Sequence, residues 1–319
     1  MNRRNLLAMI AGTAILAGSG AAYAFPDKKL TVIVPYSPGA TDQLARVVSA
    51  EVEKILGKTI VVETKPGAGG TVGGNYVAKS SSPDGYTMLL AVSSVQTVAP
   101  HQRDLPYGFD DLRPVARLTV GPNVMGARTG ASFNDLKSLV EYAKAHPGGV
   151  SFGSAGTGGA THLAGEAFAQ AAGIKLNHIP FQGVTPGIAA AVGGTVDLVL
   201  GYASAIMPQV EGGKLLAIAQ LGDKRASVLP NVTTLTEGGV DLALPANIGV
   251  WVPAGTPDDV VATLESAFGK AMQSDSVKQF ATKNMTEIDF ADSKTFADIL
   301  KKEDVFYDAL LKSLGMSKS

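Results

Sequence analysis

Short apolar runs alternate with amphipathic stretches along most of the chain. Residues 30–34 form a β-branched run, and a helical apolar face that includes Leu44 and Val52 follows it. Further strands are predicted at 59–63 and 86–92. Nearly continuous apolar strands separated by helices are typical of parallel strands covered on both faces.

The same alternation restarts after residue 120. It predicts helices at 136–145, 162–173, 188–192 and 206–210, and strands at 150–152, 177–180, 196–200 and 215–219. An apolar strand at 247–252 follows, and the remainder reads as helical, at 260–273, 276–283 and 294–314. The chain therefore predicts an α/β protein with two strand-and-helix blocks.

A middle block flanked by two extended segments indicates a discontinuous first domain. We predict domain 1 at 25–122 plus 248–319 and domain 2 at 123–247, with two strands crossing between them. Two crossings of this kind would allow hinge closure over a cleft.

The first 24 residues have the order of a secretory signal peptide. Arg3 and Arg4 precede an apolar run at 6–17, and an A-x-A site at 22–24 predicts cleavage before Phe25. The alternative, a membrane anchor, needs roughly 20 apolar residues, more than this run supplies. The paired arginines leave export by the general or the twin-arginine route open.

Composition excludes several classes of function. The 27 Lys and Arg residues nearly balance the 28 Asp and Glu residues. The sequence has no basic stripe of the kind that binds nucleic acid, which excludes a nucleic-acid-binding protein. The chain has no cysteine, which excludes a thiol nucleophile, a Cys-based zinc site and a disulfide. No histidine pair has a close metal-ligand spacing, so we predict neither a metal nor a cofactor.

Three loops rich in glycine and small hydroxyls follow predicted strands, where ligands of open α/β sheets collect. They are 35–42, 93–94 and 154–161. Helix amino-ends offer unpaired N–H groups and a positive dipole, so a carboxylate can be held there without Lys or Arg. For any one of these loops, the alternative to ligand binding is that its glycines only cap a helix or allow a tight turn. Asp42 reads as a helix-dipole partner or as an organiser of the first loop.

Enzyme function is the competing hypothesis. The stretch 67–70 lacks the spacing of a phosphate loop, and Ser154 lies in only a loose relative of G-x-S-x-G. His162 precedes Glu166 by one helical turn, a spacing that suits a base and its orienter or an ordinary surface contact. A secreted hydrolase using Ser154 would need a general base that the sequence does not place, so we predict no catalytic residue.

Several stretches in order resemble the Bug proteins, the periplasmic receptors of tripartite tricarboxylate transporters. They are V-P-Y-S-P-G-A-T-D (34–42), V-V-E-T-K-P-G-A-G-G (61–70), P-D-G-Y-T-M-L (83–89), H-L-A-G-E (162–166), H-I-P-F-Q-G (178–183), G-G-T-V-D (193–197) and V-P-A-G-T-P (252–257). The resemblance covers the chain from about residue 25 to its end.

The resemblance implies a two-lobed periplasmic binding protein of type II, a Venus flytrap with two doubly wound domains joined by two crossover strands. It also implies a periplasmic location, no cofactor, and delivery of a small organic acid to a membrane permease by a receptor that we expect to be a monomer. A sensor for a membrane signalling partner is a further alternative. The predicted ligand-binding residues are Tyr36, Ser37, Gly39, Ala40, Thr41, Asp42, Ser93, Ser94, Ser154, Ala155, Gly156, Thr157, Gly158, Thr161, His162, Phe181, Gly201 and Tyr202.

Departures from the family pattern bear on the ligand. The family often has F-D-N where this chain has Leu200, Gly201 and Tyr202, and Phe181 with Gln182 replaces Tyr with Lys. An acceptor for a ligand amine is therefore missing, and the domain 2 wall is less charged. We predict a carboxylate without an amine, either a dicarboxylate or an aromatic carboxylate of the phthalate, terephthalate or benzoate type.

Overall fold

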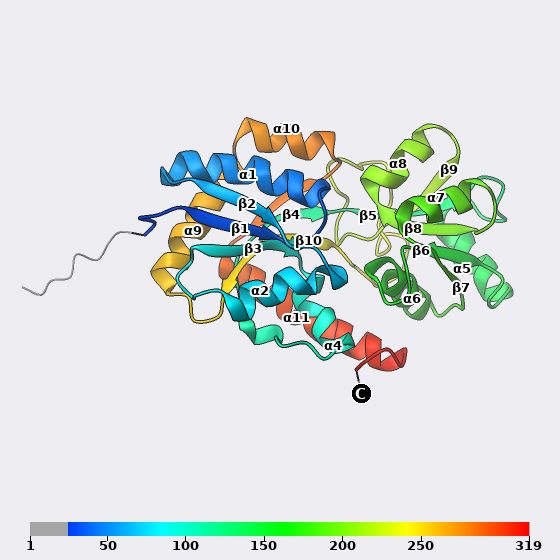
Figure 1. Cartoon of the computed structure of the whole chain (residues 1–319). Coiled ribbons are helices and arrows are strands. Elements are labelled where there is room, and N and C mark those ends of the chain that lie inside the picture. Colours follow the sequence, from blue (N-terminus) through cyan, green and yellow to red (C-terminus); the bar gives the residue numbers. More distant parts are fainter. Residues whose placement is uncertain (1–24, 319) are drawn as a thin grey trace, which may run out of the picture.

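The computed structural model describes residues 25–318 as two α/β lobes lying side by side (Figure 1). The predicted signal peptide at 1–24 lies outside the described residues. Each lobe is built on one mixed sheet, of six strands and of five strands.

The six-stranded sheet has the order β11-β4-β10-β3-β1-β2. Its strands are β1 (Leu30–Val34), β2 (Ile60–Thr64), β3 (Thr87–Val92), β4 (Leu112–Gly121), β10 (Ala246–Pro253) and β11 (Glu287–Ala291). The helices of this lobe are α1 (Ala40–Leu56), α2 (Thr71–Ser80), α3 (Ser94–Thr97), α4 (Ala99–Gln102), α9 (Asp258–Ala271), α10 (Asp275–Lys283) and α11 (Ser293–Ser313), with two 3-10 turns, η1 (Ala68–Gly70) and η2 (Phe109–Asp111). We call it lobe 1.

The five-stranded sheet has the order β7-β6-β8-β5-β9 and forms lobe 2. Its strands are β5 (Asn123–Arg128), β6 (Ser151–Ser154), β7 (Asn177–Pro180), β8 (Leu198–Tyr202) and β9 (Leu215–Gln220). Its helices are α5 (Leu136–Ala145), α6 (Ala160–Ala172), α7 (Val184–Val192) and α8 (Ala203–Glu211).

The chain passes between the sheets twice, from β4 into β5 and from β9 into β10. The six-stranded sheet thus draws on both ends of the chain and the five-stranded sheet on its middle, as the expected fold class requires. The two-lobed fold is confirmed, whereas the domain limits at 122/123 and 247/248 stay a prediction.

The sequence predicted the parallel strands better than the crossing ones. β1 pairs in parallel with β2 and β3, and β6 with β7 and β8, as expected. β10 and β5, however, pair antiparallel with their neighbours, because each crosses over in the opposite direction. The prediction that the chain beyond the last crossover is wholly helical was wrong, since β11 adds an edge strand to β4.

The cores follow the lobes except for Val98, between α3 and α4, and the end of α11, which pack in the core cluster of lobe 2. Trp251 is 1% exposed, packs on Phe296 and donates from its indole nitrogen to the Gln96 side chain at 2.7 Å, so it is a core residue of lobe 1. Leu310 and Leu311, near the end of α11, instead pack in the core cluster of lobe 2. The carboxyl-terminal helix therefore links the two lobes as a third connection.

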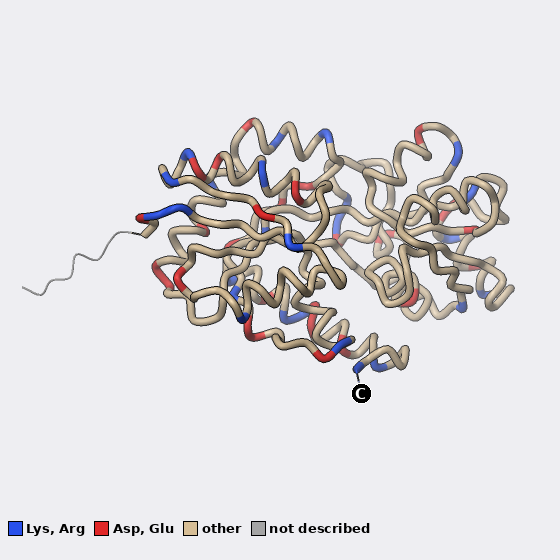
Figure 2. The backbone as a smooth tube through the Cα atoms, in the orientation of Figure 1, with Lys and Arg blue, Asp and Glu red and all other residues tan. Residues whose placement is uncertain are grey.

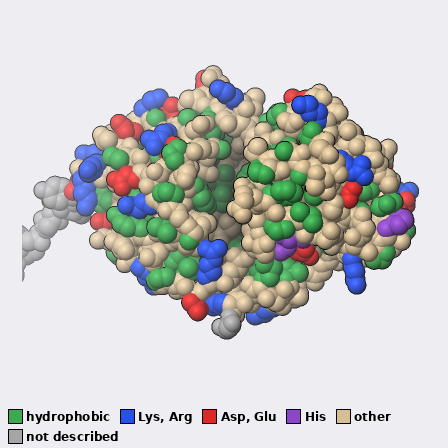
Figure 3. All heavy atoms as spheres, turned by 45° about the vertical axis from the view of Figure 1, so that its right-hand side comes forward, with side chains coloured by type: hydrophobic (Ala, Val, Ile, Leu, Met, Phe, Trp, Pro, Cys, Tyr) green, Lys and Arg blue, Asp and Glu red, His purple; other side chains and the backbone are tan. Residues whose placement is uncertain are grey.

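Positions of Lys and Arg are interspersed with those of Asp and Glu along the described backbone of both lobes (Figure 2). Figure 3 shows a hollow where the two lobes face each other. No helix among residues 25–318 combines the length and the apolar character that a membrane crossing requires.

Candidate functional site

The loop between β1 and α1 presents an uncapped helix end. Gly39 is the N-cap of α1, and no side chain accepts from the first-turn N–H groups. Asp42, in that first turn, is 6% exposed and accepts two hydrogen bonds from Arg46, both of 3.0 Å. This placement agrees with the dipole-partner reading of Asp42, whose carboxylate is held by its own helix.

Tyr36 anchors this loop to the end of β3. Its hydroxyl accepts a hydrogen bond from the Val92 backbone N–H at 3.3 Å, and burial raises the pKa of the phenol. Tyr36 is therefore a neutral hydroxyl at physiological pH.

Ser93 and Ser94 follow β3 but face different surroundings. Ser93 is 5% exposed, and its backbone N–H donates to the carbonyl of Asn247 on the crossover strand β10 at 2.9 Å. Ser94 lines the space between the lobes. Of the two predicted serines, Ser94 is thus the one placed to meet a ligand.

The loop between β6 and α6 is held by its own side chains. The Ala155 N–H donates to the Thr161 hydroxyl at 2.8 Å, and the Gly158 N–H donates to Nδ1 of His162 at 3.0 Å. Gly156 and Gly158 have φ of 134° and 76°, a region that favours glycine. Thr161 and His162 therefore shape the loop from beneath, and the N-cap of α6, Gly159, has no side-chain cap.

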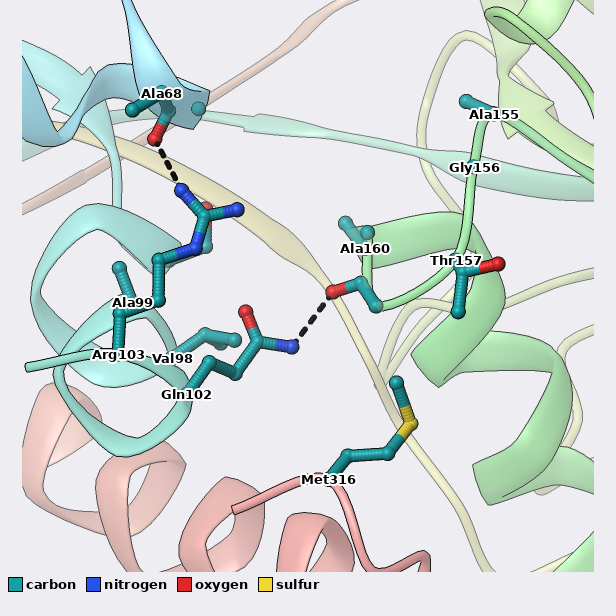
Figure 4. Close-up of a pocket in the computed structure, with 14 residues that line it drawn as sticks. Ala68, Val98, Ala99, Gln102, Arg103, Ala155, Gly156, Thr157, Ala160 and Met316 are labelled. Carbon is teal, nitrogen blue, oxygen red and sulfur yellow. Dashed lines mark hydrogen bonds between the residues drawn. The ribbon is translucent and has the colours of Figure 1, made fainter. Parts of the chain in front are cut away.

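A cavity of about 480 Å³ lies beside the β6–α6 loop, with residues from both lobes around it (Figure 4). Its lining is Ala68, Gly69, Ser94, Val98, Ala99, Gln102, Arg103, Ala155, Gly156, Thr157, Gly158, Gly159, Ala160 and Met316. A smaller cavity of about 90 Å³ is lined by Ala40, Thr41 and Tyr202 among others. Of the predicted site residues, the larger cavity is lined by Ser94, Ala155, Gly156, Thr157 and Gly158 and the smaller one by Ala40, Thr41 and Tyr202, whereas the other predicted residues line neither.

Arg103 and Gln102 were missed by the sequence analysis. Nη1 of Arg103 donates to the carbonyl of Ala68 at 3.0 Å, and Nε2 of Gln102 donates to the carbonyl of Gly158 at 2.8 Å. Figure 4 shows both side chains reaching into the junction from α4 and the residue after it. Nothing in the sequence marks them, because this short helix lacks a motif and meets Gly158 only through folding.

Three of the predicted residues that line neither cavity show why a sequence position need not face the ligand. A Cβ added at Gly201 would lie 2.7 Å from Cγ1 of Val184, inside lobe 2. Phe181 belongs to the partly buried side chains packed on a lobe 2 core cluster. Ser37 is exposed and lines neither cavity. The glycine at position 201, where the family often has aspartate, is therefore explained by packing inside lobe 2 as much as by the chemistry of the cleft.

Ser154 has a histidine partner that the sequence did not place. Its hydroxyl lies 2.6 Å from Nε2 of His178, and it also accepts from the Gly156 N–H at 3.2 Å. Ser154 is only 1% exposed, so the hydroxyl is closed off from a substrate. The pair resembles a nucleophile and its base only in the distance between the two groups. Its contacts hold the loop between β6 and α6 in place.

The residues between 25 and 318 include no cluster of three or more His, Asp or Glu side chains arranged to hold a metal ion.

Comparison with protein families places these features in context. A model described as "Tripartite tricarboxylate transporter family receptor" matches residues 44–316. A UPF0065 protein of Bordetella pertussis is 34% identical over 288 residues, which cover 89% of this chain and 89% of that protein. Protein BugT of the same species is 32% identical over 297 residues, covering 90% of this chain and 91% of BugT.

Solved structures show the same fold. A TctC solute-binding protein from Polaromonas without ligand has a TM-score of 0.83 at 28% identity, covering 91% of this chain and 99% of that one. A Rhodopseudomonas palustris protein with adipate has a TM-score of 0.75 at 25% identity (91% and 98%), and MatC of that species with bound malate has 0.71 at 28% (90% and 100%). The matched proteins are solute-binding receptors and not enzymes, so a hydrolase based on Ser154 is not supported.

Proposed function

The chain belongs to the tripartite tricarboxylate transporter receptor family, and from that premise we propose that it binds an aliphatic dicarboxylate between its lobes. The family is one of periplasmic receptors for small carboxylates. The proposal concerns which acid is bound and how the chain holds it.

The observation that carries the proposal is a difference between two sets of helices. Helices α5, α10 and α11 are capped by the side chains of Asp135, Ser274 and Asp292. In contrast, α1 and α6 have glycine N-caps and no side-chain cap, and their first turns supply residues to the two interlobe cavities. Helices α2, α7, α8 and α9 also lack a side-chain cap, so α1 and α6 are distinguished by a glycine N-cap at an interlobe cavity and not by the missing cap alone. Free N–H groups at a helix amino-end favour an anion, which can satisfy them in place of a cap.

Two anion-binding groups on opposite sides of the larger cavity favour a ligand with two carboxylates. The cavity of about 480 Å³ has the α6 amino-end on one side and Arg103 on the other. The guanidinium of Arg103 has five N–H donors and can bind a carboxylate while one donor stays on Ala68. Relatives solved with adipate and with malate also hold dicarboxylates. Aromatic carboxylates remain in the proposal as the second ligand class, on the strength of Tyr36 and Tyr202 near the junction.

We further propose that the chain is exported, cleaved before Phe25 and used as a monomer by a membrane permease. Phe25 supports this cleavage site because its ring packs edge-on against Tyr86 with centroids 5.0 Å apart, and the Asp27 N–H donates to the Tyr86 hydroxyl at 2.9 Å. A mature chain beginning at Phe25 would keep both contacts. A sensor role would use the same binding site and differ only in the membrane partner.

Calorimetric titration with malate, adipate, citrate, terephthalate, benzoate, glutamate and aspartate tests the ligand. We expect binding of an aliphatic dicarboxylate, with a thermal shift that grows with ligand concentration by mass action. Tight binding of glutamate or aspartate without any response to dicarboxylates would contradict the proposal.

The Gly159→Asp variant tests the mechanism. An aspartate at this extended N-cap can cap α6 and repel an anion, so binding should weaken by at least about ten-fold while the melting temperature holds or rises. Gly159→Asn is the matched control, because it caps without charge and should weaken binding less. Equal affinity of the Asp variant and the wild type would exclude the α6 amino-end as the anion site.

A further inference from the structure

The backbone of Gly158 connects the two lobes through its N–H and its carbonyl. Its N–H donates to Nδ1 of His162 in lobe 2, at 3.0 Å. Its carbonyl accepts from Nε2 of Gln102 in lobe 1, at 2.8 Å. We call the three residues His162, Gly158 and Gln102 the Gly158 latch.

The latch defines the protonation state of His162. A backbone N–H can only donate, so Nδ1 of His162 must carry a lone pair. The proton of the neutral ring is then on Nε2, which faces Oε1 of Glu166 at 3.5 Å. A second proton would have to sit on Nδ1 and point at the Gly158 N–H. Protonation of His162 is therefore incompatible with the latch as it stands.

The surroundings leave the His162 ring little freedom. The residue is 7% exposed, and its ring stacks on that of His178 with centroids 3.7 Å apart and planes 20° apart. His178 in turn lies 2.6 Å from the Ser154 hydroxyl and 4.9 Å, by ring centroids, from Phe152. A ring clamped in this way cannot rotate to offer Nδ1 elsewhere without disturbing the loop that begins at Ser154.

We propose that His162 is a positioning residue that, as a neutral imidazole, holds the backbone of Gly158 where Gln102 can reach it, so that protonation of His162 opens the lobes. The inference goes beyond the proposed function, because it concerns the closure of the protein itself and holds whichever acid is bound.

The direction of the pH effect follows from the neighbours of the ring. Burial lowers the pKa of His162, and Glu166 on the same helix partly opposes this. Burial and then His162 itself lower the pKa of His178 to about 4. Because the latched form binds fewer protons than a released histidine, its stabilisation is full above the ordinary pKa of 6.5 and is lost as pH falls through the lowered pKa.

Other titratable groups lie near the Gln102 side of the latch. His101 on α4 contacts Asp304 at 2.6 Å and Asp308 at 3.4 Å, both on α11, and Arg103 follows Gln102 directly. The experiment therefore includes a variant of His101, which separates these contacts from those of His162.

The absence of cysteine allows a distance measurement without background labelling. Cysteines replace Lys54 on lobe 1 and Lys144 on lobe 2, both exposed, and carry spin labels. Pulsed electron–electron resonance on the ligand-free protein then gives the interlobe distance distribution between pH 7.5 and pH 4.5. We expect the longer-distance population of the wild type to grow as pH falls.

Five variants in this background decide the proposal, and one of them, His101→Asn, should keep the wild-type pH response. His162→Ala should raise the open-to-closed ratio about five-fold at pH 7.5, the effect of losing one net hydrogen bond. His162→Asn keeps an acceptor near the Nδ1 position and cannot titrate, so it should stay closed and lose the pH response. Gln102→Ala, which leaves lobe 2 intact, should be open at both pH values. His146→Asn, a change at an exposed histidine of lobe 2, should behave as the wild type.

Two results from the latch variants would overturn the proposal. One is a wild-type distribution for Gln102→Ala at pH 7.5, because the latch would then contribute nothing to closure. The other is an unchanged pH response in His162→Asn, which would assign the titration to another group. Loss of that response in His101→Asn alone would identify His101 and likewise contradict the inference. None of these outcomes depends on a ligand, so they are distinct from failure of the dicarboxylate proposal.

Discussion

At the scale of single residues, Gly201 shows how a sequence difference changes meaning once the fold is known. In the sequence it reads as the loss of an acidic acceptor from the cleft. In the structure it lies on β8 with no room for a side chain, since an added Cβ would lie 2.7 Å from Val184 and 3.5 Å from Ile206. The neighbouring Tyr202, 41% exposed, is the residue that reaches the junction.

Gly201→Ala should therefore destabilise the protein by about 1–3 kcal/mol through overpacking, measured by chemical unfolding. Gly108→Ala is the matched control, because its φ is −119° and an added Cβ meets no atom within 4 Å. That variant should change the unfolding free energy by less than about 0.5 kcal/mol. Equal stability of the two variants would show that Val184 can move to make room for the added methyl group without a cost in stability.

At the scale of elements, three strand ends of lobe 2 are joined through one carboxylate. Asp197, just before β8, accepts from the backbone N–H of Ser151 at 2.9 Å, from its hydroxyl at 2.8 Å, and from Nε of Arg128 at 2.9 Å. Burial raises the pKa of Asp197, but these hydrogen bonds outweigh it and hold the pKa below 3.8. The carboxylate thus sets the register of β5, β6 and β8 at their shared end.

Asp197→Asn should cost about 2 kcal/mol at pH 7, because it removes the charge from a partly buried, triply bonded acceptor. A carboxyl with a lowered folded pKa stabilises above its unfolded pKa, and this contribution is lost as pH falls through the folded value. The difference between variant and wild type should therefore shrink below about pH 4, measured by urea unfolding across pH. A difference that does not change with pH would show that shape, not charge, matters at this position.

At the scale of the whole molecule, a buried polar chain joins β4, β10 and α11 near the crossovers between the lobes. The side-chain amide of Asn247 on β10 donates to Glu303 on α11, and its oxygen accepts from Arg117 on β4 at 3.1 Å. Asn247 is fully buried, and burial raises the pKa of Glu303. The chain ties a crossover strand to the helix that reaches both lobes.

Asn247→Leu should destabilise the protein by about 3 kcal/mol, since Glu303 and Arg117 would each lose a buried partner. Thermal unfolding measures the change, and Ile248→Leu, the adjacent apolar swap on the same strand, serves as control. A loss confined to the hinge would also broaden the spin-label distance distribution. An Asn247→Leu protein as stable as the control would mean that water replaces the lost bonds.

The sequence alone determined most of the local structure and the class of the protein. Period-2 and period-3.6 patterns predicted α5 and β7 with their observed limits, because such patterns depend on neighbours a few residues apart. The small-residue loops near Thr41 and Thr157 were also found, because uncapped helix ends have a local signature.

The tertiary structure decided what those local signals could not. The partnership of Ser154 with His178 spans 24 residues, and that of Gln102 with Gly158 spans 56. Arg103 enters the cavity only because α4 lies against lobe 2, and β11 forms because β4 offers an edge. Contacts between distant segments depend on how the lobes pack. They cannot be predicted from the residues that neighbour each segment along the chain. The small-residue loops could be predicted from the sequence. The neutral histidine beneath one of them could not, and neither could its link to the opposite lobe.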